Sequence, residues 1–371
     1  MTSARYVIIG AGFAGAATAY HLARSGAGKI MVVEQERVAG VHASGRNASM
    51  IRQIISEPST AALAYEGAAF IRSIPADWPV PVMFEQKGSL LLGKGEAWKN
   101  LIRDTDRARE RGIEVELWSR QKAEEYVSVI KGTDLEGAVW CPTDGVVDIH
   151  ALLTGYIKAA MSMGTEFRYG SPVREINVKD ERVTGIVVGD ERIDTETVIN
   201  AAGAWAGVIG QMAGAAKVPL RPLRRHLFVT PPLSWVDPHW PFVWDVSHDF
   251  YFRPDSGGLL LCPCDQDEMA PGIPPTDDSI VELLAEKVKR YFPEISNVPI
   301  KTSWAGLRTF SSDGRFVIGW DRKTKGFFWL AGLGGHGVTT SSSTGALAAR
   351  LILNRDGKRA KELDPERFQA Q

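Results

Sequence analysis

Short apolar runs alternate with glycine-rich and polar stretches near the start of the chain. Tyr6–Ile9 is a continuous apolar run that leads into closely spaced glycines and an alanine-rich stretch with helical spacing over 14–25. A second apolar run, Ile30–Val33, ends at Glu34. Short apolar runs bounded by turn residues are typical of strands buried on both faces of a parallel sheet. The pattern therefore predicts a strand–helix–strand unit at the N-terminus.

The rest of the chain divides into segments of helical and of strand pattern. Helical spacing of apolar residues predicts helices over 61–74, 98–111, 149–162, 278–291 and 338–353. Alternating or short apolar runs predict strands over 89–92, 165–168, 173–178, 182–188, 192–195, 197–200, 225–230, 249–253, 258–262, 315–318 and 327–331. The segment 216–309 is rich in Pro, Trp and Phe, and its short strands indicate a second domain built on a mostly antiparallel sheet.

The glycines of the first unit have the spacing Gly10-x-Gly12-x-x-Gly15. In this spacing the first glycine makes a tight turn, the second lets the backbone approach a pyrophosphate, and the third lets helix and strand pack closely. An acidic residue about 20 residues further on can bind a ribose hydroxyl, and Glu34 has that place. The motif predicts a dinucleotide site without distinguishing NAD from FAD. The residues expected to contact the dinucleotide here are Gly10, Gly12, Phe13, Ala14, Gly15, Glu34 and Gln35.

Composition narrows the class of protein. A chain of 371 residues with 44% hydrophobic and 23% charged residues is long enough for two globular domains. Its 43 basic and 44 acidic residues give a net charge of −1, which does not indicate a nucleic-acid partner. Three cysteines are too few for a disulfide framework, and no metal site is expected. The first strand begins at residue 6 and no apolar run approaches membrane-spanning length, so we expect a cytoplasmic protein without an integral membrane segment.

No second helical crossover follows the first unit. Its place is taken by a polar loop over 41–52, a predicted meander over 173–195, and distant small-residue loops. The motifs are His42-Ala-Ser-Gly-Arg-Asn-Ala, Asn200-Ala-Ala-Gly-Ala-Trp, Ser303-Trp-Ala-Gly-Leu-Arg, and Gly334-Gly-His-Gly-Val-Thr. Together with the glycine motif, this arrangement resembles the D-amino-acid oxidase/glycine oxidase family of FAD-dependent oxidoreductases. Within that family the pattern is most similar to the bacterial D-arginine dehydrogenase type.

The resemblance implies an α/β fold in which a Rossmann-like FAD-binding domain is interleaved with a smaller, mainly antiparallel β-sheet substrate domain (α+β). The FAD-binding domain would comprise 1–78, 140–215 and 310–371, and the substrate domain 79–139 and 216–309. Beyond the first unit, the implied FAD contacts are Ala43, Ser44, Arg46, Asn47, Ala48, Val173, Ala202, Gly203, Trp205, Gly306, Arg308, Gly334, Gly335, His336, Gly337, Val338 and Thr339.

Two of these segments carry further expectations. A glycine loop that opens a helix directs N–H donors and a positive dipole end at one point, which would stabilise the negative charge of a reduced flavin. The segment at His42 resembles one that carries a covalent flavin in dimethylglycine-dehydrogenase relatives. The D-arginine type has a histidine there with noncovalent FAD, so noncovalent binding is expected and a covalent link stays open.

For the substrate, the resemblance implies that Arg308 clamps a carboxylate, for which the planar guanidinium fork is suited. Tyr251 would help to bind the same carboxylate. Arg225 matches an arginine in the related strand of the family, and a shift of one residue would put Arg224 in that place instead. Arg52 matches a carboxylate-binding arginine of monomeric sarcosine oxidase, and His336 either faces the flavin or supports its loop. If they do not bind substrate, Arg308 would be a surface arginine in an ion pair and Tyr251 an aromatic residue of the core.

The expected reaction is oxidation of the C–N bond of a small amino acid, a D-amino acid by this resemblance, to an imino acid that hydrolyses to a keto acid. Electrons would pass to a quinone, a carrier or oxygen. The strand over 258–262 lacks the lysine that activates oxygen in sarcosine-type oxidases, which favours a dehydrogenase. In the D-arginine dehydrogenase type, an acidic residue and a tyrosine select a substrate with a basic side chain. The residues near 55 and 86–89 of this chain do not match them, so we do not expect a pocket specific for arginine. Three alternatives stay open: a sarcosine, glycine, proline or opine-type enzyme, a 2-hydroxy-acid dehydrogenase, and a flavin subunit of a hetero-oligomeric dehydrogenase.

Overall fold

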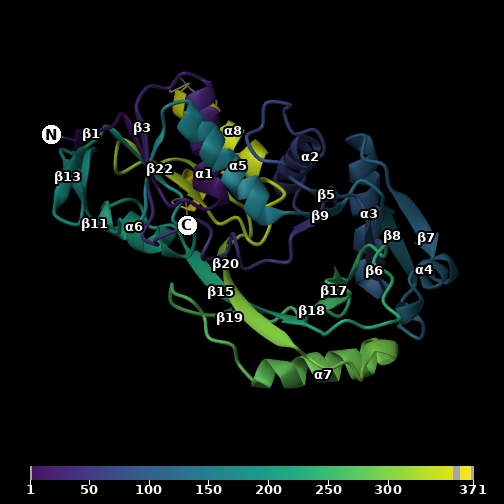
Figure 1. Cartoon of the computed structure of the whole chain (residues 1–371). Helices are drawn as coiled ribbons and strands as arrows, with labels where there is room; N and C mark the ends of the chain where they lie inside the picture. The colour runs from purple at the N-terminus through teal and green to yellow at the C-terminus, as the bar shows by residue number, and fades with distance from the viewer. Residues whose placement is uncertain (1, 354–359, 369–371) are drawn as a thin grey trace.

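A computed structural model describes residues 2–353 and 360–368, in which a six-stranded and a nine-stranded sheet lie side by side (Figure 1). The six-stranded sheet has the order β10-β3-β2-β14-β22-β21. All its neighbouring pairs are parallel except β21–β22. Its strands are β2 (Tyr6–Ile9), β3 (Ile30–Val33), β10 (Glu166–Arg168), β14 (Thr197–Asn200), β21 (Val317–Trp320) and β22 (Phe327–Ala331). The predicted first strand–helix–strand unit therefore lies at the centre of this sheet.

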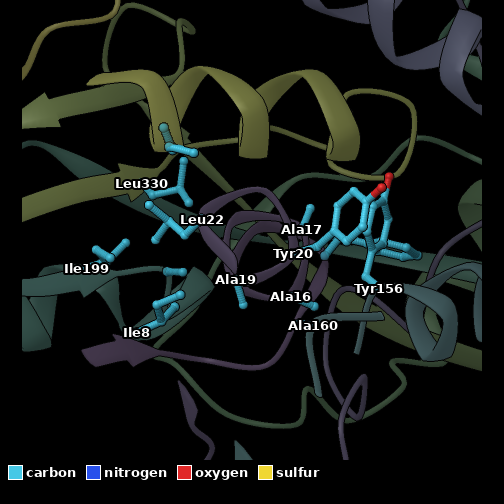
Figure 2. Packing of buried hydrophobic residues seen from close by; sticks show 14 of the residues in the cluster. Ile8, Ala16, Ala17, Ala19, Tyr20, Leu22, Tyr156, Ala160, Ile199 and Leu330 are labelled. Atoms are coloured by element: carbon cyan, nitrogen blue, oxygen red, sulfur yellow. The ribbon is translucent and has the colours of Figure 1, made fainter. Parts of the chain in front are cut away.

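Helices cover one face of the six-stranded sheet. They are α1 (Phe13–Arg24), α2 (Pro58–Arg72), α5 (Ile149–Ser162) and α8 (Ser341–Leu353). Small side chains let these helices approach closely, and a Cβ on Gly345 of α8 would lie 2.6 Å from the backbone of Ala17. Figure 2 shows the alanines of α1 between the sheet and its helical neighbours, with Tyr20 beside Tyr156 of α5. The alanine-rich sequence of α1 thus serves close helix packing.

The other face of this sheet is covered by a meander and one helix. These are β11 (Val173–Lys179), β12 (Arg182–Val188), β13 (Glu191–Asp194) and α6 (Ala206–Met212), with β1 (Thr2–Ser3) pairing to β13 and η2 (Gly203–Trp205) before α6. Tyr6 and Ile8 pack on the helical side, whereas Val7 and Ile9 pack against the meander side. Because successive strand residues point to opposite faces, a four-residue apolar run fills both layers.

The nine-stranded sheet is antiparallel except for the pair β6–β16. Its strands are β6 (Ser89–Gly93), β7 (Glu116–Ser119), β8 (Gly137–Cys141), β15 (Leu220–Val229), β16 (Phe242–Asp245), β17 (Phe250–Asp255), β18 (Gly258–Cys262), β19 (Asp267–Glu268) and β20 (Thr302–Ser311). The flanking elements are α3 (Gly95–Glu110), α4 (Arg120–Tyr126), α7 (Ser279–Tyr291), η1 (Ser128–Ile130) and η3 (Pro293–Ile295). A small sheet of β4 (Met50–Ile51), β9 (Gly145–Val147) and β5 (Phe84–Glu85) adjoins it, and η4 (Pro365–Phe368) follows α8.

The predicted fold class is confirmed, and several predicted bounds are wrong. The final helix begins at Ser341 rather than at 338, because Gly332, Gly334 and Gly335 take positive φ values and the chain stays irregular to Thr340. The strand predicted over 225–230 is the second half of the ten-residue β15. The expected two-domain division remains a prediction. Its boundaries after 139 and 309 fall inside β8 and β20, both of which are paired within the nine-stranded sheet.

No helix in the described part of the chain combines the length and apolar character that crossing a bilayer requires.

The contact between α1 and α8 makes the fold acid-sensitive at His21. Its Nε2 lies 3.2 Å from the Ser342 hydroxyl, and burial together with nearby Arg24 lowers the pKa of His21 from 6.5 to about 4. The unfolded chain therefore binds a proton at higher pH than the folded protein, so stability is lost as pH falls through this window. His21→Gln should reduce the stability difference between pH 7.5 and pH 5 by about 2 kcal/mol, measured by urea unfolding.

Candidate active site

A cavity of about 340 Å³ runs from the carboxyl ends of β2, β3, β14 and β22 to the nine-stranded sheet. Parallel sheets bind nucleotides in the crevice outside these strand ends. The cavity wall is assembled from segments far apart in the sequence: the glycine turn before α1, the loop 40–50, the ends of β14 and β22, and residues of β15, β16, β17 and β20.

The three motif glycines leave no room for side chains at the first end of the cavity. Gly10 has φ +106°, and a Cβ there would lie 2.6 Å from the Ala201 carbonyl oxygen. A Cβ on Gly12 would lie 2.9 Å from Ser44 Oγ, and one on Gly15 would overlap the carbonyl oxygen of Gly10. The turn therefore presents bare backbone at the start of α1, as binding of a pyrophosphate requires.

Glu34 lines the same end of the cavity and is fixed by two backbone donors. Its Oε2 accepts a hydrogen bond from the Ala11 N–H at 2.8 Å, and its Oε1 accepts one from the Glu36 N–H at 3.0 Å. A carboxylate has further acceptor sites on both oxygens. Glu34 can therefore accept hydrogen bonds from ribose hydroxyls while it keeps those from Ala11 and Glu36.

The loop over 40–50 is held in shape by its own polar side chains. Arg46 donates from Nε to the Val41 carbonyl at 3.1 Å and from Nη1 to the Ala305 carbonyl at 3.3 Å, which ties the loop to β20. A Cβ on Gly306 would lie 2.7 Å from the Arg46 carbonyl oxygen, so this contact depends on a glycine. The predicted flavin contacts Arg46 and Gly306 thus also join the two sheets.

His42 contacts residues on either side of this loop. Its Nε2 lies 2.9 Å from Glu36 Oε1, and its ring centroid is 4.5 Å from that of Trp205. Both contacts order the loop beside the cavity. Noncovalent binding of the flavin beside His42 stays a prediction.

The loop between β22 and α8 closes the far side of the cavity. The Gly334 N–H donates to the Thr309 carbonyl at 2.9 Å, and a Cβ on Gly334 would lie 2.8 Å from the Phe310 ring. A Cβ on Gly335 would lie 3.0 Å from Arg308 Cδ. The glycines therefore let β20 lie directly against this loop, and that approach brings Arg308 to the cavity.

Arg308 has an unusual combination of burial and missing partners. Its Nε and Nη2 are buried and have no acceptor among the described residues. Burial and the nearby positive charge of Arg225 lower the pKa of Arg308 to about 10. Buried donors without acceptors are costly, and a planar carboxylate would satisfy them with two parallel hydrogen bonds.

Arg225 and Tyr251 line the cavity close to Arg308. The Arg225 guanidinium donates from Nε to the Asp265 carbonyl at 3.2 Å and from Nη2 to the Cys264 carbonyl at 3.1 Å. Tyr251 is buried, and burial raises the pKa of its hydroxyl. The Arg225 guanidinium is therefore hydrogen-bonded by the protein, whereas Nε and Nη2 of Arg308 are not, among the described residues.

The cavity wall contains every predicted site residue except Gly15, Arg52, His336 and Thr339. Gly15 packs against the turn, and Thr339 Oγ1 accepts a hydrogen bond from the Arg52 N–H at 3.3 Å. The Arg52 guanidinium lies 4.2 Å from the centre of the Trp244 ring. Burial and the charges of Arg52 and Arg308 lower the pKa of His336 to about 3, so it is neutral near pH 7. The roles expected for all the predicted site residues, inside the cavity wall and outside it, stay predictions.

Sequence reasoning missed the wall formed by Met50, Leu227 and Trp244. No motif marks these residues. Leu227 on β15 and Trp244 on β16 come to one side of the cavity through the intervening strands β18 and β17, and Met50 reaches it from β4. The sequence hypothesis of an exposed face for a partner subunit named Trp235, Trp240 and Trp244. Of these, Trp235 is 42% exposed, whereas Trp240 is buried and Trp244 lines the cavity.

The sequence profile of the DAO family, described as FAD dependent oxidoreductase, matches residues 5–351. The chain belongs to this family. FAD is therefore its cofactor, and the bare glycine turn, the fixed Glu34 and the extended cavity fit the dinucleotide.

Among curated proteins, the FAD-dependent oxidoreductase domain-containing protein 1 of Bos taurus is 26% identical, over 94% of this chain and 80% of its own length. The mitochondrial sarcosine dehydrogenase of Mus musculus is 25% identical over 99% of this chain, which spans only 42% of that relative. Among solved structures, L-proline dehydrogenase from P.horikoshii matches with a TM-score of 0.89 and 23% identity, covering 100% of this chain and 98% of that one. Glycine oxidase from Geobacillus kaustophilus matches with a TM-score of 0.82 and 22% identity, covering 97% and 96%.

Proposed function

We propose that this protein oxidises the C–N bond of an amino acid or N-substituted amino acid, whose carboxylate binds to Arg308. The observation that carries the proposal is the pair of buried Arg308 donors without a protein acceptor. A relative named sarcosine dehydrogenase and structures named glycine oxidase and L-proline dehydrogenase support an amine-bearing acid as substrate. Primary D-amino acids and secondary amines such as sarcosine or proline fit this site about equally well.

The residues of the cavity would act by binding and orienting the substrate. Arg308 would fix the carboxylate, and the hydroxyl of Tyr251, which also lines the cavity, would donate to the same group. The positive charges of Arg225 and Arg308 disfavour a protonated amine nearby, so the amine would bind neutral and need no side-chain base. When bound, FAD supplies the acceptor for the hydride removed from the substrate carbon. The resulting imine would then be hydrolysed by water to a carbonyl compound and an amine or ammonia.

We further propose that electrons leave to a quinone or protein carrier rather than to oxygen. The strand β18 (Gly258–Cys262) beside the cavity region has the sequence Gly-Leu-Leu-Leu-Cys and therefore no lysine to activate oxygen. A cytoplasmic location is part of the same proposal, and fractionation of the source cells would test it.

Anaerobic mixing of the flavin-loaded protein with possible substrates tests the proposed reaction. The panel should contain D- and L-amino acids, sarcosine, proline and the matching 2-hydroxy acids. Oxidised flavin absorbs blue light, and we expect this absorbance to disappear with at least one amino acid and to persist with the matching 2-hydroxy acid. Bleaching by hydroxy acids alone would contradict C–N oxidation. Slow recovery of the colour in air, with fast recovery on adding a quinone, would support a dehydrogenase.

A further inference from the structure

The part of the cavity around Arg308 is apolar apart from its cationic and hydroxyl groups. Met50, Leu227 and Trp244 form the wall next to Tyr251. Among the described residues that line the whole cavity, the one carboxylate is that of Glu34, which lies at the glycine turn. A substrate side chain in the Arg308 region therefore meets apolar surface, and no counter-ion is there for a cationic group.

Trp244 is held in place by two neighbours. Its ring centroid lies 4.7 Å from that of Tyr251, and the Arg52 guanidinium carbon lies 4.2 Å from the ring centre. A cation above an indole ring is attracted to it, more strongly when both are shielded from water. Arg52 is half-buried, and desolvation lowers the pKa of its guanidinium, so its contact with Trp244 is partly shielded from water.

The charged groups around Arg52 differ from those around Arg308. Arg52 is close enough to the buried carboxylate of Asp144 for the two charges to interact. Among the described residues, no carboxylate is prominent in the electrostatic surroundings of Arg308, where the charge with the largest influence on its pKa is that of Arg225. The positive charge of Arg52 is thus compensated within the protein, whereas that of Arg308 is left for an anionic ligand to compensate.

We infer that the substrate is a monocarboxylate with an uncharged, apolar side chain that packs against Trp244, and that Arg52 positions Trp244 instead of binding the carboxylate. This inference rests on the proposed function. It makes Trp244 the residue that determines how long a side chain the site accepts. Arg52 is a positioning residue that acts through the indole ring.

Non-oxidisable acids of similar length test the substrate class on the flavin-loaded protein. Hexanoate, 5-aminopentanoate and glutarate differ in carrying an apolar, a cationic or an anionic end, and their binding is read from the change in flavin absorbance. We expect hexanoate to bind at least roughly tenfold more tightly than either charged acid, because apolar surface does not replace the lost hydration of a charge. Equal or tighter binding of either charged acid would overturn the inference.

Two variants test the roles of Trp244 and Arg52. In Trp244→Leu, octanoate should gain roughly threefold to tenfold in affinity relative to hexanoate, since each buried methylene adds about threefold. Arg52→Met should shift the same ratio in the same direction, with the Kd for acetate unchanged within about twofold. Trp235→Leu, which alters an exposed tryptophan outside the cavity, is the matched control.

The outcomes separate this inference from the function on which it rests. If Arg52→Met weakens acetate as much as hexanoate, Arg52 binds the carboxylate and its positioning role is overturned. If Trp244→Leu leaves the octanoate-to-hexanoate ratio unchanged, Trp244 does not limit the side chain. If no amino acid reduces the flavin of the unmodified protein, the proposed function itself fails.

Discussion

Replacing Arg308 with methionine should weaken the binding of every carboxylate substrate by roughly 30-fold to 5000-fold. Truncating one partner of a buried, hydrogen-bonded charge pair costs about 2–5 kcal/mol, and the loss would fall on the complex because Arg308 is proposed to pair with the ligand. The measurement is the KM of flavin-linked turnover together with the Kd of a non-oxidisable acid. An unchanged KM would remove Arg308 from the site.

Two comparisons make the Arg308 experiment specific. Arg221→Met on β15 removes an exposed arginine that pairs with Glu268 outside the cavity, and it should leave KM unchanged. The ligand-free Arg308→Met protein should unfold at the same temperature as the parent or higher. Its methionine would replace two buried donors that have no acceptor in the described protein and would relieve the repulsion from Arg225. A large loss of thermal stability would mean that Arg308 is a structural residue.

Gly15→Ala should give protein that carries less than about a tenth of the flavin of the parent, because the turn has no space for the new side chain. The added Cβ would overlap the carbonyl oxygen of Gly10, which is backbone and cannot rotate away. Relieving the overlap would move the turn that is expected to contact the pyrophosphate. The measurement is flavin released per chain on denaturation. Normal flavin content would contradict the role of this turn.

A matched glycine in another helix controls for the substitution itself. Gly207 lies in α6, and a Cβ added to it would meet no atom within 4 Å. Gly207→Ala should keep full flavin content and be neutral or slightly stabilising, since alanine is favoured over glycine in helices by about 1 kcal/mol. Circular dichroism of both variants separates loss of flavin from loss of folding.

The sequence predicted best those parts of the site that depend on neighbouring residues. The turn from Gly10 to Gly15 and Glu34 belong to one contiguous unit, so strand, turn and helix could be inferred from spacing alone. The family resemblance added the distant loops that no local pattern connects. The predicted start of α8 was wrong because a glycine loop before a helix can stay irregular, and periodicity does not report φ.

The sequence did not predict which residues the pairing of strands brings together. Trp244 lines the cavity because β16 pairs with β17, and this places its ring beside Tyr251. The position of Arg52 against Trp244 likewise depends on three segments meeting in space. Short apolar strands predict burial, but they do not say which sheet neighbour a strand will have.

The pairing of β15 with β20 has a consequence for how such an enzyme can change. Both strands are paired over all ten residues, from Leu220 with Ser311 to Val229 with Thr302, so Arg225 and Gly306 are opposite one another and Arg308 is fixed two residues along. A one-residue shift would turn Arg308 to the other face of the sheet. The whole segment 230–301 leaves from one end of this pair and returns to it. We therefore expect substrate preference to change through that segment while Arg308, the proposed carboxylate anchor, keeps its place.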